Sequence, residues 1–385
     1  MPASTSYRIL HLVSSMRWTG VAEPAASLAK QQIMAGHDVR AAAIWERSLE
    51  DGLKERGIPL ARELELQRRI NPLALHQDVH RLRRFLLHNQ IGVVHCHLLH
   101  DHWIAAMAIR PLRGSERPLL VRTVHRYEKM RRDPWHTWLF ASVTDVVITV
   151  STEQRELILA AYPEIRERLH VIFGAVDAQR FRPDLPGAAL VRADMGEPAD
   201  AKVAGIVAHL GYNRGHRWLL DAAPAVVETV PNATIWIVGQ GELKYPLRRQ
   251  LRAPQFKDRV LMASYRTDDL PETYCAMDVA LLLGLGSEGS ARAALEAMSC
   301  ARPVIAVRKG ALVDTISHGE DGLLVDENDV AGLTEALVRL LASPSEARRM
   351  GANARRKILE RFTDEQRYLA TQAVYEQGFQ RSRPA

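Results

Sequence analysis

The chain has 385 residues, of which 47% are hydrophobic and 25% are charged. This composition excludes a disordered, collagen-like or coiled-coil protein, and the length predicts two or three domains. The formal net charge of +6 is compatible with an anionic ligand or an anionic membrane surface but is too small to indicate nucleic acid. Three widely separated cysteines exclude a disulfide framework and favour a reducing cytoplasm. Because no apolar run reaches the roughly 18 residues of a membrane span, any membrane contact is expected to be peripheral.

Short apolar runs alternate with longer amphipathic segments along the chain. In the first half we expect strands at 8–13, 39–43, 93–96, 119–124, 146–150 and 171–173. After a Gly- and Pro-rich break near 184–200, runs follow at 203–208, 234–238, 260–262, 279–283, 304–307 and 323–325. The alternation predicts two doubly wound parallel sheets, with functional residues in the loops after the strands. A helical pattern from 364 to 379 predicts a last helix that packs back on the first domain.

A glycine-rich turn after the run at 279–283 leads into an Ala-rich helix. Ser290 is in position to cap this helix, whose free N–H groups favour an anion. Glu288 lies on the turn and Glu296 about two helical turns later, so their carboxylates would address different parts of an elongated ligand. The segment predicts a phosphate or sugar site. In the alternative interpretation, Glu296 pairs with Arg292 on an exposed helix face and Glu288 decorates a surface turn.

Two further turns follow strands of the second half. Arg214 lies in the turn after 203–208, where a guanidinium can hold a diphosphate; the alternative is a solvated turn. Gly239 and Gly241 follow the next strand, where small residues allow a ligand or a helix to approach closely. Because neither this turn nor the first strand has the glycine spacing of a dinucleotide site, NAD binding is disfavoured.

With these motifs the chain resembles the family four retaining glycosyltransferases, which use nucleotide sugars and have the GT-B fold of two facing Rossmann-like domains. The resemblance extends over nearly the whole chain. Its most specific motif is the pair of glutamates separated by seven residues, met by Glu288 and Glu296. Further matches lie at 35–39, 94–97, 123–125, 149–151, 174–177, 238–241 and 321–325.

The resemblance implies an acceptor domain at 1–185, a nucleotide-sugar donor domain at 186–363 and a C-terminal helix at 364–385 on the first domain. Glu288 would touch the transferred sugar and Glu296 the ribose. The groups implied around the donor phosphates and sugar are Arg214, His209, Gly241 and the backbone of Gly289, Ser290 and Ala291. Most relatives have an arginine where this chain has His209, so the charge at that position depends on pH.

In the first domain, the resemblance marks Gly20 and His125. Relatives often have two consecutive glycines before the first helix. This chain keeps only one of them, Gly20, and has Val21 in the place of the other. His125 ends the run at 119–124 and would lie near the reacting sugar, where it could donate to the sugar or position the acceptor. Glu288, Arg214 and His125 are therefore the expected catalytic residues.

The implied activity is transfer of a hexose, with retention, from a UDP-sugar or GDP-sugar to a glycan or lipid-linked acceptor in lipopolysaccharide or other surface polysaccharide synthesis. No metal and no other cofactor is expected. The protein is expected in the cytoplasm, with peripheral contact to the inner face of the membrane. The alternatives are a nucleotide-sugar epimerase, a sugar-phosphate glycosyltransferase, or a non-catalytic nucleotide-sugar-binding subunit; a glycosidase is disfavoured.

Two other clusters have two interpretations each. Histidines at 95, 97, 100 and 102 suit a metal site, but the match at 94–97 favours the wall of a cleft. Five basic residues between 122 and 132, followed by Trp135 and Trp138, suit an anionic bilayer or a phosphorylated glycan acceptor. A solvated loop explains the second cluster equally well.

Overall fold

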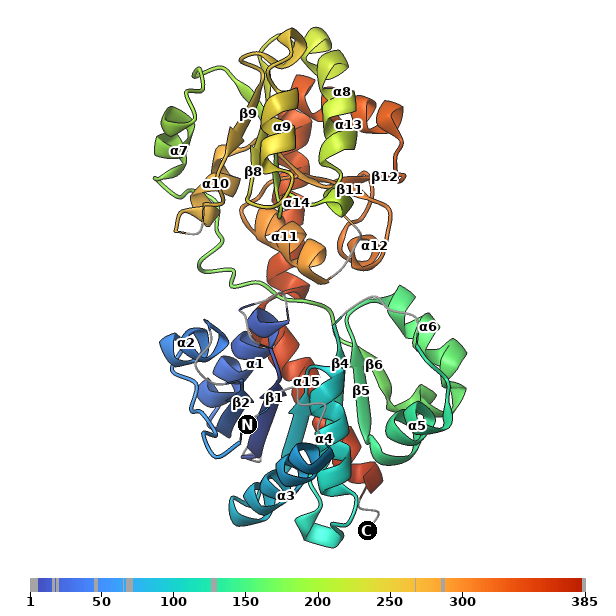
Figure 1. Ribbon diagram of the computed structural model, residues 1–385. Helices are drawn as coiled ribbons and strands as arrows, with labels where there is room; N and C mark the ends of the chain where they lie inside the picture. Colours follow the sequence, from blue (N-terminus) through green and yellow to red (C-terminus); the bar gives the residue numbers. More distant parts are fainter. Residues whose placement is uncertain are drawn as a thin grey trace. The chain divides into compact units, whose positions relative to one another are not determined.

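The computed structural model describes residues 6–15, 18, 21–44, 48–64, 66, 72–125, 130–266, 268–284 and 288–382, with the backbone alone at Pro72 and Glu288. The chain divides into two compact units (Figure 1). Unit 1 comprises residues 1–174 and 364–385, and unit 2 comprises residues 175–363. The C-terminal segment thus belongs to the same unit as the N-terminal strands.

Unit 1 is a six-stranded sheet in the order β2-β1-β3-β4-β5-β6, with every pair parallel. Its strands are β1 (Arg8–Val13), β2 (Asp38–Ala43), β3 (Val93–Cys96), β4 (Leu119–Val124), β5 (Val146–Thr149) and β6 (Leu169–Val171). Its α-helices are α1 (Ala22–Met34), α2 (Ser48–Glu55), α3 (Pro72–His88), α4 (Leu99–Ile109), α5 (Pro134–Thr137), α6 (Thr152–Ala161) and α15 (Asp364–Ser382). The strand order reverses between β1 and β3, so the carboxyl ends of these strands border the crevice where doubly wound folds bind ligands.

Unit 2 repeats the design in the order β12-β11-β10-β7-β8-β9, again with parallel pairs. Its strands are β7 (Lys202–Val207), β8 (Ala233–Val238), β9 (Val260–Ala263), β10 (Val279–Leu282), β11 (Val304–Val307) and β12 (Gly322–Val325). Its α-helices are α7 (Ala188–Asp194), α8 (His216–Thr229), α9 (Lys244–Gln250), α10 (Leu270–Ala276), α11 (Glu288–Ser299), α12 (Ala311–Thr315), α13 (Val330–Ala342) and α14 (Pro344–Arg361). Here the order reverses between β7 and β10. The two sheets confirm the predicted α/β fold class.

Two apolar clusters cover the two faces of the unit 1 sheet. One joins the sheet to α3 and α4, and the other joins it to α1 and α15. Tyr375 of α15 is fully buried in the second cluster, and Phe379 packs against its edge. Burial of such large side chains contributes about 1.5–3 kcal/mol each, which explains why the last helix is held on this sheet.

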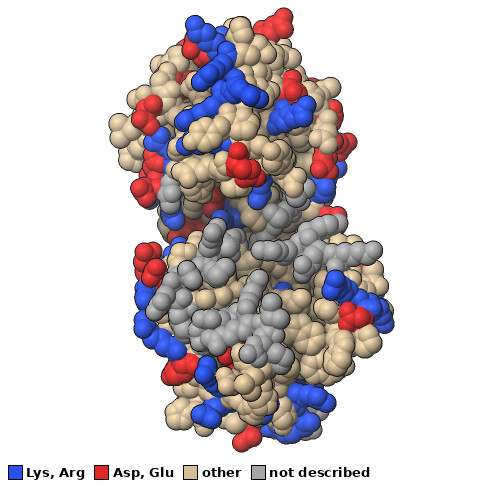
Figure 2. Space-filling view, viewed as in Figure 1, with Lys and Arg blue, Asp and Glu red and all other residues tan. Residues whose placement is uncertain are grey.

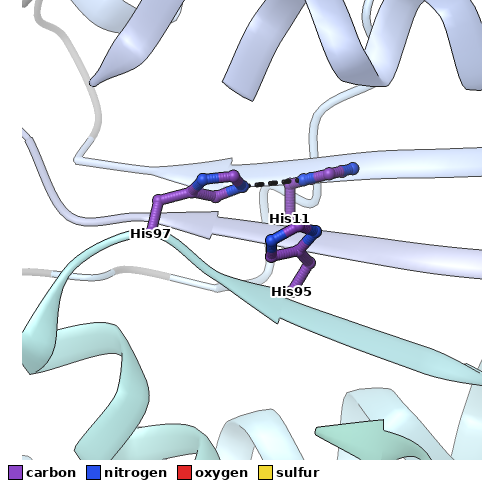
Figure 3. A group of neighbouring side chains, drawn as sticks. All are labelled: His11, His95 and His97. Carbon is purple, nitrogen blue, oxygen red and sulfur yellow. Dashed lines mark hydrogen bonds between the residues drawn. The ribbon is translucent and has the colours of Figure 1, made fainter. Parts of the chain in front are cut away.

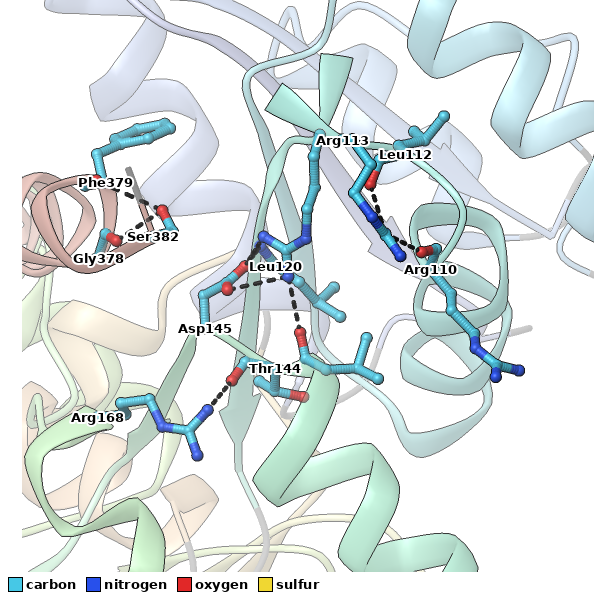
Figure 4. Close-up of polar contacts among 12 residues, drawn as sticks. Arg110, Leu112, Arg113, Leu120, Thr144, Asp145, Arg168, Gly378, Phe379 and Ser382 are labelled. Carbon is cyan, nitrogen blue, oxygen red and sulfur yellow. Dashed lines mark hydrogen bonds and ion pairs between the residues drawn. The ribbon is translucent and has the colours of Figure 1, made fainter. Parts of the chain in front are cut away.

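Asp145 fixes the edge of the sheet at which the strands begin (Figure 4). Its carboxylate accepts two hydrogen bonds from Arg117, at 2.9 and 3.0 Å, and one from the backbone N–H of Leu120 at 2.8 Å. Beside it, Arg168 donates to the Thr144 carbonyl at 2.7 Å. These contacts join the starts of β4 and β5. His125 lies at the opposite edge of the sheet, directly after the carboxyl end of β4.

Candidate functional site

The loops that follow β7 and β10 meet at the strand-order reversal of unit 2. Gly215, between the short helix Tyr212–Arg214 and α8, has φ +74°. A Cβ at this residue would lie 2.3 Å from the Cβ of Leu283, which follows β10. Glycine is therefore required both by the left-handed backbone and by the close approach of the two loops. This approach places Arg214 against the start of α11.

Arg214 and Ser290 form the centre of the unit 2 site. Arg214 Nη1 donates to Ser290 Oγ at 3.2 Å, and Ser290 is only 3% exposed. The prediction that Ser290 caps the helix is wrong, because α11 already begins at Glu288. The N–H groups of Gly289 and Ser290 instead fall within the first turn, where helix geometry provides no i−4 carbonyl partner, whereas the N–H of Ala291 is the first that has one. A guanidinium and a helix N-terminus thus converge, as an anion site requires.

Glu296 lies two turns further along α11. Its Oε2 accepts a hydrogen bond from the Tyr274 hydroxyl at 3.3 Å, and its Oε1 lies 3.5 Å from Arg292 Nε. The predicted pairing with Arg292 is therefore present, but the helix face is not exposed, since Glu296 is 9% exposed. Burial, and secondarily the Glu296 charge, raise the pKa of Tyr274 well above its usual value, so this phenol remains a donor. A carboxylate only accepts hydrogen bonds, so donors such as hydroxyls suit it.

Glu288 is the first residue of α11, but its side chain lies outside the described residues. Its predicted contact with the transferred sugar stays a prediction. The rise of an α-helix, about 1.5 Å per residue, separates it from Glu296 by about 12 Å along the axis. The two carboxylates therefore belong to different ends of any ligand that spans this helix.

His209 and Gly241 lie at the ends of the neighbouring strands β7 and β8. His209 Nε2 is 2.9 Å from Oε2 of Glu242, and both side chains are exposed. A Cβ on Gly241 would lie 2.5 Å from the Leu210 carbonyl oxygen, so the two loops are packed backbone to backbone. The structure thus pairs His209 with a carboxylate, whereas Arg214 is directed to the α11 terminus.

In unit 1, His125 directly follows β4 and is 6% exposed. Its Nε2 is 2.9 Å from Nδ1 of His97, which follows β3. Gly20 lies outside the described residues. His125 and Gly20 belong to unit 1, whereas the other predicted site residues belong to unit 2.

The histidines of β1 and β3 form a buried cluster of His11, His95 and His97 (Figure 3). Their ring nitrogens offer three ligand atoms within 4.8 Å of one another. His102, which the metal interpretation included, instead contacts the Thr144 hydroxyl at 2.7 Å. Burial lowers the pKa of His95 and of His97 well below the usual range, and that of His11 to about 4, so all three are neutral near pH 7.

The basic segment from 122 to 132 is only partly at the surface. Arg122 is 4% exposed on β4, where it donates to the Cys96 carbonyl at 3.5 Å, so it cannot contact a bilayer. Arg131 and Trp135 are exposed, while positions 126–129 lie outside the described residues. Basic side chains also gather over α9 of unit 2 (Figure 2). Within the described part of the chain, no helix combines the length and apolar character needed to cross a membrane.

Several residues of these sites were not found from the sequence. Tyr274 and Gly215 support Glu296 and Arg214 in unit 2, and His11, Gln32 and Tyr375 surround the unit 1 histidines. Only His11 carried a local signal, as a polar residue inside an apolar strand. The others depend on contacts that are distant in sequence.

Two doubly wound parallel sheets in one chain are the architecture of the GT-B fold. A glycosyltransferase from Rickettsia africae superposes with a TM-score of 0.86 at 16% identity, over 98% of this chain and 99% of that one. Anabaena HepE, crystallised with UDP and glucose, gives 0.78 at 19% identity, over 96% and 99%. These likenesses confirm the GT-B fold.

Sequence comparisons give the family. The model for Glycosyltransferase Family 4 matches residues 18–180, and the model for Glycosyl transferases group 1 matches residues 201–343. The chain belongs to the family four, group 1 glycosyltransferases.

Two curated relatives illustrate the range of this family. A GDP-mannose-dependent alpha-(1-6)-phosphatidylinositol monomannoside mannosyltransferase from Mycolicibacterium smegmatis is 31% identical over 223 residues, 56% of this chain and 58% of that relative. UDP-Gal:alpha-D-GlcNAc-diphosphoundecaprenol alpha-1,3-galactosyltransferase from Escherichia coli is 27% identical over 292 residues, 73% and 74% of the two chains. Both names specify a nucleotide-sugar donor and a lipid-linked acceptor.

Proposed function

We propose that the protein transfers a hexose from a UDP-sugar or GDP-sugar to a glycan or lipid-linked acceptor, with retention of anomeric configuration. The observation that carries this proposal is the Arg214 guanidinium, 3.2 Å from Ser290 at the N-terminus of α11. Breaking the bond between the anomeric carbon and the phosphate oxygen leaves negative charge on the diphosphate. A fixed cation and the N-terminus of a helix at that position stabilise the developing charge.

Each residue then has a role in the transfer. Arg214 and the first turn of α11 hold the diphosphate, Glu296 accepts from the ribose hydroxyls, and Glu288 holds the transferred sugar. The acceptor hydroxyl oxygen forms the new bond to the anomeric carbon, and its proton passes to the leaving phosphate oxygen. Because Arg214 and the helix supply the positive charge, the reaction is proposed to need no divalent metal.

Retention and the acceptor class rest on the relatives. The names of both relatives specify an α-linked product, which a retaining enzyme makes from an α-configured donor. Their lipid-linked acceptors support a similar acceptor here, and with it synthesis of lipopolysaccharide or another surface glycan. With such an acceptor, we propose that the enzyme works at the cytoplasmic face of the membrane as a peripheral protein.

Nucleotide binding tests the donor site first. The protein is melted with UDP, GDP, ADP, CMP and dTDP, each with EDTA and with magnesium. A ligand at about 100 times its dissociation constant stabilises by about 2.7 kcal/mol, which is readily detected. One preferred nucleoside diphosphate, bound equally well with EDTA, supports the proposal.

Two variants locate the effect. Arg214→Ala is expected to lose most of the stabilisation, whereas Arg217→Ala, which removes an exposed arginine nearby on α8, keeps it. The preferred nucleotide then identifies the nucleotide sugar for turnover assays, with the anomeric configuration of the product read by NMR. Equal binding by wild type and Arg214→Ala would contradict the site, and an inverted product would contradict retention.

A further inference from the structure

A continuous set of hydrogen bonds crosses the core of unit 1 beneath His125. We call it the histidine network; its members are His125, His97, His11, Gln32, Tyr375, His95 and Thr123. They lie on three strands or directly after them, and on two helices, and each is less than 7% exposed. A buried polar group must satisfy its hydrogen bonds inside the protein, so the direction of every bond in the network matters.

The first arm runs from Gln32 to His125. Gln32 Oε1 lies 2.8 Å from His11 Nε2, and His11 Nδ1 lies 2.9 Å from His97 Nε2 (Figure 3 shows the second contact). His97 Nδ1 in turn lies 2.9 Å from His125 Nε2. The arm therefore links the side chain of one α1 residue to the predicted catalytic histidine at the end of β4.

The Gln32 carbonyl oxygen fixes the direction of this arm, because it can only accept. His11 must donate through Nε2–H, and a neutral imidazole has a single N–H. His11 Nδ1 therefore accepts from His97 Nε2–H, and His97 Nδ1 accepts from Nε2–H of His125. Burial lowers the pKa of His11 and of His97 well below 7, so both rings are uncharged and each has a single N–H.

The second arm agrees with the same orientation of Gln32. The Gln32 amide Nε2 donates to the Tyr375 hydroxyl at 3.4 Å, which donates to His95 Nδ1 at 2.6 Å. His95 then donates from Nε2 to the Thr123 hydroxyl at 2.6 Å. Turning the Gln32 amide over would reverse every bond in both arms, so this one side chain sets the direction of the whole network.

We propose that Gln32, acting through His11 and His97, holds His125 as the Nε2–H tautomer, with Nδ1 as its acceptor atom. A group that meets His125 at Nδ1 must then be a donor, such as a sugar hydroxyl. His125 thus accepts from the substrate instead of donating to it. Gln32, His11 and His97 are positioning residues for this contact. The substrate contact rests on the proposed function, whereas the tautomer does not.

A metal bound by His11, His95 and His97 is the competing explanation of the cluster. Its ligands would have to converge on one point about 2.0–2.1 Å from each nitrogen. The three rings are instead stacked, with centroids 4.5–5.2 Å apart and interplanar angles of 18–29°. All six ring nitrogens are already in the hydrogen bonds of the network. The geometry therefore favours the network over the metal.

Nitrogen NMR of the full-length protein labelled with ¹⁵N-histidine tests the proposal directly. The His125 signals, assigned by their loss in His125→Asn, are expected to show a protonated Nε2 and an unprotonated Nδ1. A proton on Nδ1 in the wild-type protein would overturn the proposal without any variant. Zinc in stoichiometric amount, with metal-shifted signals from His11, His95 and His97, would overturn it as well.

Gln32→Met removes the acceptor that sets the direction, and both tautomers of His125 are then expected. Gln372→Met is the matched control, because Gln372 is also a buried glutamine of unit 1 but makes no side-chain hydrogen bond to the described residues. It is expected to leave the His125 signals unchanged. The same His125 tautomer in both variants would refute the role of Gln32.

Kinetics then separate the tautomer from the proposed function. In Gln32→Met, kcat/KM for the nucleotide sugar is expected to fall about twofold to tenfold, as for the loss of one hydrogen bond, while the affinity for the free nucleoside diphosphate stays unchanged. An unchanged kcat/KM would refute the substrate contact. If the wild-type protein transferred no sugar at all, the proposed function would fail, yet the spectra would still decide the tautomer.

Discussion

Replacing Gly215 with alanine tests how the unit 2 site is assembled. The residue has φ +74°, and the added Cβ would lie 2.3 Å from the Leu283 Cβ and 2.8 Å from the Leu283 carbonyl oxygen. The substitution therefore lowers the free energy of unfolding for two reasons: the left-handed backbone disfavours alanine, and the added Cβ overlaps with Leu283. Gly196→Ala separates them, because Gly196 has φ +72° in the same unit with nothing within 4 Å of its added Cβ.

The magnitudes of the two penalties differ. A left-handed backbone costs an L-residue about 1–2 kcal/mol, which is the full loss expected for Gly196→Ala. The overlap adds about 1–3 kcal/mol, so Gly215→Ala should lose about 2–5 kcal/mol. Relief of the overlap moves the loop that carries Arg214. Loss of its charge-assisted contact, about 1.5–3 kcal/mol, weakens nucleoside diphosphate binding by about tenfold to a hundredfold.

Urea unfolding and calorimetric titration of the preferred nucleoside diphosphate measure both effects. Gly196→Ala should be moderately destabilised and bind like wild type, whereas Gly215→Ala should be less stable and bind more weakly. Equal stability of the two variants would refute the contact with Leu283. Wild-type affinity in a destabilised Gly215→Ala would refute the placement of Arg214 by this loop.

Three further predictions concern the donor site and the buried histidines. Glu296→Ala is expected to weaken nucleotide binding, while Glu288→Ala mainly lowers kcat with the sugar donor; equal, negligible effects in calorimetry and kinetics would contradict both roles. Nucleoside diphosphate affinity should fall with added salt, and this dependence should shrink in Arg214→Ala but persist in Gln32→Met, as titrations at two ionic strengths would show. Burial lowers the pKa of His11 and of His216 from 6.5 to about 4. Between pH 6.5 and pH 4 the unfolded chain therefore binds more protons than the folded one, and the free energy of unfolding falls as the pH drops through this range. The loss is on the order of 3 kcal/mol for each histidine at 1.4 kcal/mol per pKa unit; urea unfolding that is independent of pH from 6.5 to 4 would contradict it.

The strands could be predicted where an apolar run is bounded by turn residues. The runs at 93–96 and 304–307 match β3 and β11 residue for residue. The run at 171–173 does not, since β6 occupies Leu169–Val171. Its extent is set by pairing with β5, in which Thr149, the last residue of β5, lies opposite Val171. Periodicity locates an apolar segment, but the register of the neighbouring strand decides where pairing ends.

The candidate sites were predictable to the degree that they are local. The positions of Arg214 and of the start of α11 follow from strand-to-helix turns. The predicted capping role of Ser290 was wrong, because Ser290 is the third residue of the helix. Tyr375 lies 280 residues from His95, its hydrogen-bond partner, and no local pattern could connect them. That contact depends on the strand order and on the return of α15 to unit 1.

The two candidate sites differ in their electrostatics, and under the proposed function each suits a different part of a sugar nucleotide. In unit 2, Arg214 and the start of α11 present positive charge, which favours a diphosphate and the charge that develops on it. In unit 1, burial lowers the pKa of His11, His95 and His97, so these three rings offer directed hydrogen bonds without net charge. Neutral imidazoles carry no charge that attracts phosphate oxygens, and they can still hydrogen-bond to hydroxyls. Under the proposed function, burial of these histidines would leave charge recognition to unit 2 and recognition of sugar hydroxyls to unit 1.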